Sequence, residues 1–302
     1  MNTLDTSTDD KGLRTAGKVF WCIGFMFIML CFVLLFGDDG WTSMAPYEDW
    51  ARQHGIEPDA TTRTLWHWLS GPPLVILACA LAGFAGHLLA AYTNGLRFRL
   101  AFPRHTAISM LPGLFYPRWM PNSDEDLARR YARLMWGGPI GLTLLLALAV
   151  GGFVSAAATG LHMWRDLLCL LSAGAALWAA GQLVPDQTRG NVNTGWMISR
   201  LARHGPHERR FVALVRVARQ AAANTPPQDW DNALVEQALT PSDGTTHEAE
   251  ALLVGATHYA AIGEHDRARE LLGRALTLRR LLGKHGVKIV EAMLSQLPDP
   301  QG

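Results

Sequence analysis

Residues 137–160 read GGPIGLTLLLALAVGGFVSAAATG and contain no charged side chain. An α-helix needs about 20 mainly apolar residues to cross the roughly 30 Å hydrocarbon core of a bilayer. Periodicity does not distinguish a buried core helix from a membrane-spanning one, but length does when several such stretches occur in one chain. This stretch therefore predicts a transmembrane helix.

Three other stretches have the same character and length, namely residues 19–36, 73–93 and 167–184. The first is longer than the apolar region of a usual signal peptide, and no small-x-small cleavage site follows Phe36, so we interpret it as an uncleaved span. Together the four stretches predict an all-α, polytopic membrane protein. We expect a cytoplasmic segment 1–18, a four-helix transmembrane domain 19–185 and a helical domain 186–302.

Overall composition agrees with this division. Of 302 residues, 49% are apolar and 18% are charged, and the net charge is +1. These values exclude a disordered, collagen-like or coiled-coil chain and make a simple soluble enzyme doubtful. They give no sign of nucleic-acid binding, and four cysteines do not make a disulfide scaffold.

The distribution of lysine and arginine predicts the orientation. These residues number 3 in the first 18 positions, 2 in the loop 37–72, 7 in the loop 93–136, 1 in the loop 161–166 and 14 after residue 184. Rich and poor segments alternate, as the positive-inside rule requires. We therefore expect both termini in the cytoplasm, and we interpret the seven loop arginines as topology determinants near anionic headgroups, with a specific lipid pocket as the alternative.

From residue 186 the chain becomes hydrophilic, alanine-rich and helical in pattern. We expect one helix over 198–223, ended by Pro226-Pro227, and a second capped by Asp229 or Asp231. A third is expected to open at Thr246 after the turn at 241–244. Two helices beyond it show tetratricopeptide spacing, although only one such unit is convincing. The residues at this spacing are Ala256, Tyr259, Gly263, Ala268, Leu272 and Ala275.

His87 lies inside the second span, where an ionisable side chain is a functional candidate. Small residues recur at every fourth position beside it, in the rows Ala78-Ala82-Gly86-Ala90 and Cys79-Gly83-His87-Ala91. Such a face favours close helix packing, so we expect His87 to point into the bundle. The alternatives for this residue are a hydrogen-bonded packing role, a vestigial or ligand-sensing role, and metal binding.

This region resembles the site-2 protease family of intramembrane zinc metallopeptidases, in which a spanning helix carries H-E-x-G-H-x-x-A. Gly86-His87-Leu88-Leu89-Ala90 is similar to the second half of that motif. Further similar segments follow in the family's order, over roughly residues 64–280. They are Gly95-Leu96-Arg97-Phe98, Gly137-Gly138-Pro139 (which opens a core helix in the family), Leu183-Val184-Pro185 with Gly190 and Thr194-Gly195, and Pro226-Pro227-Gln228-Asp229-Trp230.

The chain departs from the family at the positions that carry its chemistry. By position, Gly83 replaces the first histidine, Phe84 the glutamate base and Thr194 the aspartate ligand, and Gln182 replaces an asparagine. A catalytic zinc site of this kind needs two histidines one helical turn apart, a general base and a third ligand. Only His87 remains, so we expect no catalytic residue and no zinc cofactor. The resemblance then implies an inactive member, a pseudoenzyme.

Three functions stay open from the sequence. The first is a non-catalytic bacterial inner-membrane protein that binds a transmembrane client and a cytoplasmic partner. The second is an active metallopeptidase with an atypical zinc site, for which His67, His105, His162 or Asp186 would supply ligands. The third is a membrane-anchored scaffold whose helical tail carries the whole function. In each case we expect contact with membrane lipid and none with nucleic acid.

Overall fold

The computed structural model describes residues 8–36, 53–55, 60–98, 119–186 and 192–298. Its contacts divide the chain into two compact units. We call Met1–Ala90 with Met135–Val184 the membrane unit, and Ala91–Leu134 with Pro185–Gly302 the tail unit. Each is described below by itself.

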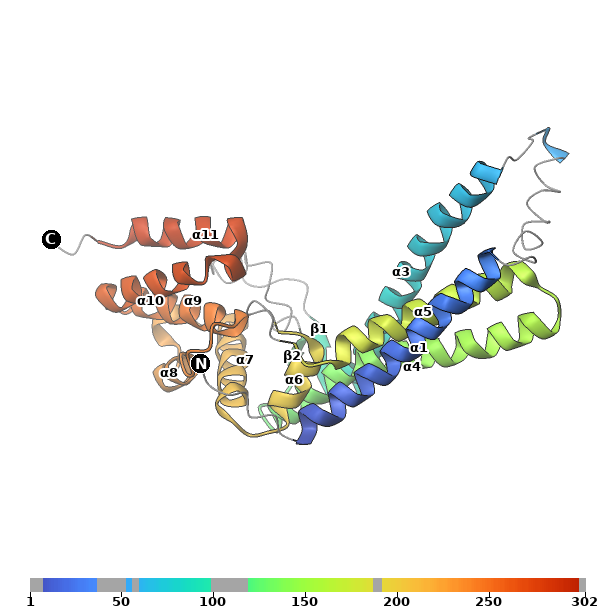
Figure 1. Cartoon of the computed structure of the whole chain (residues 1–302). Helices are drawn as coiled ribbons and strands as arrows, with labels where there is room; N and C mark the ends of the chain where they lie inside the picture. Colours follow the sequence, from blue (N-terminus) through green and yellow to red (C-terminus); the bar gives the residue numbers. More distant parts are fainter. Residues whose placement is uncertain (1–7, 37–52, 56–59, 99–118, 187–191, 299–302) are drawn as a thin grey trace. The chain divides into compact units, whose positions relative to one another are not determined.

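Four helices are long and apolar enough to cross a membrane, as the sequence predicts. They are α1 (Thr8–Phe36), α3 (Ala60–Thr93), α4 (Leu127–Ala158) and α5 (His162–Leu183) (Figure 1). Their candidate spans are Lys11–Cys31, Gly71–Thr93, Leu127–Ala158 and Trp164–Leu183. The chain is thus a mainly helical protein with the features of a membrane protein.

The Gly137-Gly138-Pro139 segment does not open a helix, contrary to the expectation from the family. It lies inside α4, which begins ten residues earlier at Leu127. Proline lacks an N–H and its ring crowds the preceding turn, so its cost in a helix is local, and neighbouring helices make it tolerable in a membrane. Pro72 and Pro73 lie inside α3 in the same way.

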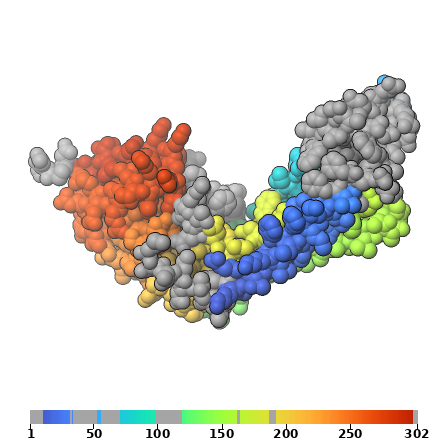
Figure 2. All heavy atoms as spheres, in the orientation of Figure 1, coloured from blue at the N-terminus to red at the C-terminus, as the bar shows by residue number. Residues whose placement is uncertain are grey.

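Helices α1 and α5 pack against each other along their length (Figure 1). Gly24 permits this approach, because a Cβ there would lie 2.7 Å from Leu177 Cγ. Outside this contact, α1 exposes large apolar side chains such as Trp21 and Val33, and part of the helix surface is seen in blue in Figure 2. An apolar outer face is what lipid contact requires.

The tail unit contains a short antiparallel sheet and a series of helices. Strands β1 (Leu96–Phe98) and β2 (Trp119–Pro121) pair with Arg97 opposite Met120. The helices are α6 (Thr194–Leu201), α7 (Pro206–Ala222), the 3-10 turn η5 (Pro227–Asp229), α8 (Asn232–Ala238), α9 (Thr246–Ala261), α10 (His265–Thr277) and α11 (Arg279–Gln296).

Residues 91–134 group with the tail unit, although the sequence analysis assigned them to the transmembrane domain. Two contacts with α7 explain the grouping. The Tyr131 ring meets the Phe211 ring edge to face, with centroids 5.0 Å apart. Asp124 also forms an ion pair with Arg219. Contacts of this kind join segments far apart in sequence, so a composition boundary does not reveal them.

The single helix expected over residues 198–223 is two helices, α6 and α7. His204 between them has a φ of 49°, a left-handed conformation that interrupts a right-handed helix. Pro206 then occupies the first turn of α7, where a missing N–H costs nothing. Gly205-Pro206 is the local sequence signal of this break, because proline disfavours a helical conformation in the residue before it. The apolar periodicity alone does not reveal it.

Helices α7 to α11 together form the core of the tail unit. Its members are small or aliphatic and almost fully buried, among them Val217, Val235, Leu252, Leu272 and Val290. Helices α9 and α10 form a hairpin whose facing alanines, Ala256, Ala268 and Ala275, are fully buried. Gly263 makes the turn with a φ of 87°, which favours glycine.

Candidate functional site

His87 lies in the membrane unit where α3, α4 and α5 meet. A Cβ built on Gly138 of α4 would lie 2.6 Å from His87 Nε2 and 2.6 Å from Gln182 Oε1 of α5. The imidazole and the amide therefore converge on the same glycine. Gly83, one turn before His87, faces the same amide, since its Cβ would lie 3.9 Å from Gln182 Nε2. We call Gly83, His87, Gly138 and Gln182 the His87 cluster.

Gln182 Oε1 in this cluster is buried and has no hydrogen-bond partner within the described part of the chain. An amide oxygen without a donor loses its interaction with water and gains nothing in exchange, which costs about 1–3 kcal/mol. In hydrocarbon there is no water to replace the lost bond. The oxygen is thus a buried acceptor that no donor of the described residues satisfies.

Close contact between α3 and α4 holds the cluster in place. A Cβ on Gly137 would overlap the Gly86 carbonyl and lie 2.8 Å from the Ala90 Cβ. Likewise, a Cβ on Gly141 would overlap the Ala82 carbonyl. Small residues thus let the two backbones touch, as the rows of small residues on α3 predict.

The other family positions are dispersed. Phe84, at the position of the family's base, is 49% exposed on the surface of the membrane unit. Thr194, at the position of the aspartate ligand, is the first residue of α6 in the tail unit. The preceding Asn193 caps that helix by accepting from the Trp196 N–H at 2.9 Å. Gly195 and Pro185 are buried.

The substitute ligands fall mostly outside the described side chains. His105 lies outside the described residues, and so do the side chains of His67 and His162. Asp186 is exposed, and its N–H donates to Asn193 at 3.1 Å. Among the described residues, no group of three or more His, Cys, Asp or Glu side chains could hold a metal ion.

Of the seven arginines in the loop 93–136, the structure describes only some. Arg99, Arg104 and Arg118 lie outside the described residues, as does Gly190 of the family-like segment. Arg129, Arg130 and Arg133 lie in the first turns of α4, and Arg97 is in β1. Arg133 donates to Asn94 at 3.3 Å, and Arg129 is 4.0 Å from Asp126 at the surface. The Arg133 contact joins residues 39 positions apart, whereas the Arg129 contact lies within one turn of the chain.

The tail unit contains a polar centre that the sequence analysis missed. Arg210 is 1% exposed, and its guanidinium donates to Asp243 at 2.8 Å and to the Ala238 carbonyl at 3.1 Å. His207 Nδ1 lies 2.9 Å from the same carboxylate. We call Arg210, Asp243, His207 and the adjacent His247 the Arg210 centre.

Charge and burial shift two pKa values in the Arg210 centre. Burial alone would raise the pKa of Asp243, but His207, Arg210 and Thr245 together hold it well below its usual range. Burial, with the positive charge of Arg210, lowers the pKa of His247 to about 4, so that histidine is neutral near pH 7. The Trp196 and Phe211 rings pack around His247 and explain the loss of solvent.

The turn that supplies Asp243 is held by Glu248. This carboxylate accepts from the Ser242 hydroxyl at 2.5 Å and from the Asp243 and Gly244 N–H groups at 2.7 and 2.6 Å. The sequence Pro241-Ser242-Asp243-Gly244 predicts a turn, and a turn is normally solvated. An arginine and an aspartate 33 residues apart give no signal that they pair inside the unit.

Comparison with known proteins adds no relative: no protein-family model, no curated protein and no solved structure matches this chain.

Proposed function

We propose that the chain is a non-catalytic membrane protein, related to the site-2 proteases, that binds a transmembrane segment of another protein. The observation that carries the proposal is the unpaired Gln182 Oε1 beside His87, buried among three helices that span the membrane. A helix arriving from the lipid with a side-chain donor would satisfy this oxygen. Interhelical hydrogen bonds of this kind contribute to helix association in membranes.

The residues at the family's zinc positions do not fit a catalytic zinc. Glycine at 83 offers no donor, Phe84 has no proton-accepting atom, and a neutral threonine hydroxyl is a poor ligand. The neighbours of His87 in the cluster are an amide and glycines. Glutamine and histidine are instead residues that hydrogen-bond across helices in membranes. We therefore derive no hydrolytic step.

A defined pair of model helices tests the binding. Leucine-rich peptides of about 20 residues, one with a central asparagine and one with leucine there, are labelled as energy-transfer donors. The labelled full-length chain in phosphatidylcholine vesicles is the acceptor. We expect it to bind the asparagine peptide about threefold to tenfold more tightly than the leucine peptide. Equal affinity for the two peptides would contradict the proposal.

A matched pair of variants identifies the site. Gln182→Leu removes the acceptor, so the preference for the asparagine peptide is expected to disappear. Thr143→Val removes a polar group of the same unit that is already satisfied by the Pro139 carbonyl at 2.8 Å, so the preference should remain. Zinc analysis of the detergent-purified chain distinguishes the alternative, because near-stoichiometric zinc that depends on His87 would support an atypical metallopeptidase.

We further propose that both termini are cytoplasmic, in a bacterial inner membrane, and that the tail is a tetratricopeptide-like module for a cytoplasmic partner. The charge alternation between loops supports the orientation, and the α9–α10 hairpin with its buried alanines supports the module. A green fluorescent protein fused after Gly302 should fluoresce, whereas alkaline phosphatase fused there should be inactive. The reverse result would place the tail outside.

The tail as a membrane-anchored scaffold is the second candidate function. The observation that favours it is the large buried core of α7 to α11, which belongs to the tail unit alone. In that case the Gln182→Leu variant keeps all partner binding, and variants of the tail lose it. Such a result would separate the scaffold from the intramembrane function.

A further inference from the structure

Helix α11 presents a basic surface that no other part of the described structure neutralises. Arg279, Arg280, Lys284 and Lys288 are exposed along its first three turns. Gly283 between them has a φ of 65° and a ψ of 176°, so the helix is kinked at that residue. The left-handed φ favours glycine, which allows the kink.

The arginines of the preceding helix show the contrast. In α10, Arg267 pairs with Glu236, Arg269 with Asp266 at 3.2 Å, and Arg274 with Glu248 at 3.3 Å. Across the described residues, none of the four α11 cations has a carboxylate within 4 Å or a hydrogen-bond acceptor. The four cations of α11 are therefore not held in ion pairs among the described residues, whereas the arginines of α10 are each paired.

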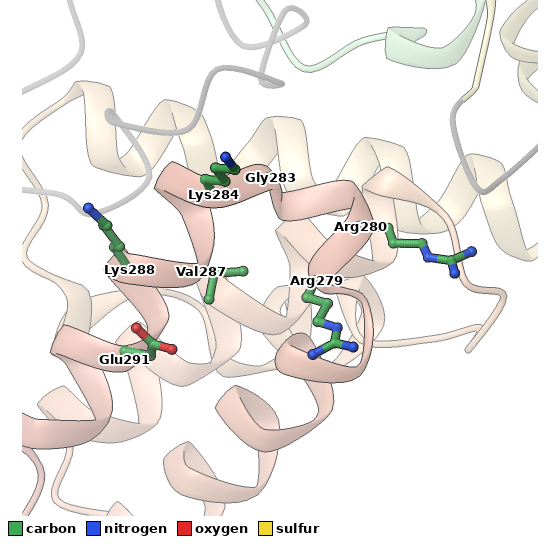
Figure 3. Close-up of a pocket in the computed structure, with 7 residues that line it drawn as sticks. All are labelled: Arg279, Arg280, Gly283, Lys284, Val287, Lys288 and Glu291. Atoms are coloured by element: carbon green, nitrogen blue, oxygen red, sulfur yellow. The ribbon is translucent and has the colours of Figure 1, made fainter.

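A shallow cavity of about 500 Å³ lies on this face. Figure 3 shows the apolar Val287 side chain between those of Arg279 and Lys288, with Lys284 on the adjacent turn and Arg280 pointing away. Glu291 is the one carboxylate in the lining, next to Lys288. The cavity thus combines basic side chains with one apolar side chain, Val287, and one carboxylate, Glu291, that can accept a hydrogen bond from a hydroxyl group.

We propose that this cavity binds the headgroup of an anionic phospholipid with a polyol group, such as phosphatidylglycerol, at a bilayer surface. Arg279, Lys284 and Lys288 would hold the phosphate, because guanidinium and ammonium groups are the usual phosphate partners. Glu291 would accept from a headgroup hydroxyl, and Val287 would contact the glycerol backbone.

A lipid headgroup fits these observations better than an acidic peptide. The cavity is small and short, and its one carboxylate would repel a run of acidic side chains. The chain also carries four helices suited to a membrane, so headgroups are abundant wherever it resides. A basic cluster attracts anionic lipid with a strength that grows with each added lysine or arginine. The inference concerns the tail unit and does not rest on the intramembrane site.

Vesicle sedimentation tests the proposal with the full-length chain. The protein is held in nanodiscs of neutral phosphatidylcholine and mixed with sucrose-loaded vesicles that contain either phosphatidylcholine alone or phosphatidylcholine with about one third phosphatidylglycerol. We expect sedimentation only with the anionic vesicles. For Lys284→Gln/Lys288→Gln, the partition coefficient is expected to fall about tenfold to thirtyfold.

Two control variants distinguish binding in the cavity from attraction by the overall positive charge of the tail. Arg209→Gln/Arg269→Gln also removes two positive charges from the tail but lies outside the cavity, so its sedimentation should match that of the unmodified chain. Lys284→Arg/Lys288→Arg keeps the charge and should restore binding, which excludes misfolding as the cause. Equal losses in both Gln pairs would overturn the proposal. So would binding of a polyglutamate peptide that depends on Lys284 and Lys288 without any sedimentation by anionic vesicles.

Discussion

The membrane unit and the tail unit are both helical, but different residues bring their helices together. In the membrane unit, Gly86, Gly137 and Gly141 let two backbones touch. In the tail unit, an arginine and an aspartate are buried around a packed aliphatic core. Lipid is as apolar as the helices, so burial of apolar surface drives no association there, whereas water drives it strongly in the tail. Helix packing therefore depends on close backbone contact in the membrane unit, and on apolar burial and a buried ion pair in the tail unit.

The largest expected effect concerns the charge in the tail. Arg210→Met leaves the Asp243 carboxylate, 12% exposed, without its guanidinium. Removing one partner of a buried ion pair costs about 3–5 kcal/mol, and we expect the lower end of this range because His207 and Thr245 still contact Asp243. Hydrogen exchange of α7 to α9, measured by mass spectrometry on the full chain in detergent, should reveal this loss.

The neighbouring residue provides the control. Arg209 is exposed, and no partner of its side chain is found in the described part of the chain. Arg209→Met should therefore change protection in α7 by less than about 0.5 kcal/mol. If the two variants lose protection equally, the ion pair of the Arg210 centre does not stabilise the tail.

Acid should weaken the tail through His247. Its pKa is about 4 in the folded chain against about 6.5 when unfolded, since burial and Arg210 disfavour the charged form. Between these two values the unfolded chain binds the proton and the folded chain does not, so stability decreases as pH falls. The contribution is fully present above pH 6.5, and its total loss by pH 4 is about 3 kcal/mol.

Hydrogen exchange of α9 at pH 7 and pH 5, corrected for the intrinsic exchange rate, measures this effect. His247→Phe removes the titrating group and keeps a ring between Trp196 and Phe211. The variant should lose less protection than the unmodified chain over the same pH interval. An unchanged pH dependence in this variant would assign the acid sensitivity to other groups.

In the membrane unit, the addition of a single methyl group at Gly137 should reduce stability. A Cβ at Gly137 would overlap the backbone of Gly86, which cannot move aside as a side chain can. Gly137→Ala should therefore destabilise the unit by about 2 kcal/mol, in the range of overpacked cores. Denaturation by sodium dodecyl sulfate, followed by circular dichroism in mixed micelles, measures this.

Gly151 is the matched position on the same helix. A Cβ there would meet nothing within 4 Å, so Gly151→Ala should be neutral or stabilising through helix propensity. The difference between the two alanine variants isolates the contact from the propensity. Equal midpoints for both would mean that α3 and α4 do not touch at Gly86 and Gly137.

The extent to which sequence predicts structure differs between the units for the same physical reason. Lipid imposes length and apolarity on a helix, so the four membrane helices are evident in the sequence. The rows of small residues around His87 also predict a packed face. That His87 and Gln182 converge on Gly138 is not predictable, because the two residues are 95 positions apart and neither apolar stretch determines how α3 and α5 align.

In the tail, the apolar pattern predicts helices but neither the break at His204 nor the polar centre. The break follows from the local sequence Gly205-Pro206, which the apolar pattern does not include. Arg210 reaches Asp243, 33 residues away, through tertiary packing that no periodic signal records. The break between α8 and α9 at 241–244 and the buried hairpin alanines are local features that the sequence indicates.

The smallest expected effect concerns a choice that the sequence leaves open, the cap of α8. Asp231 is the N-cap, and its carboxylate accepts from the Ala233 N–H at 2.9 Å. Asp229 lies two residues earlier in the 3-10 turn and makes no such bond. Asp231→Ala should cost about 1 kcal/mol, because one helix N–H loses its acceptor, while Asp229→Ala should cost less than about half of that. Protection of the α8 amides reports both variants, and a larger loss for Asp229→Ala would move the start of the helix. This cost is a fraction of that expected for Arg210, since water replaces a lost cap at the surface more completely than it replaces a guanidinium beside the mostly buried Asp243 carboxylate.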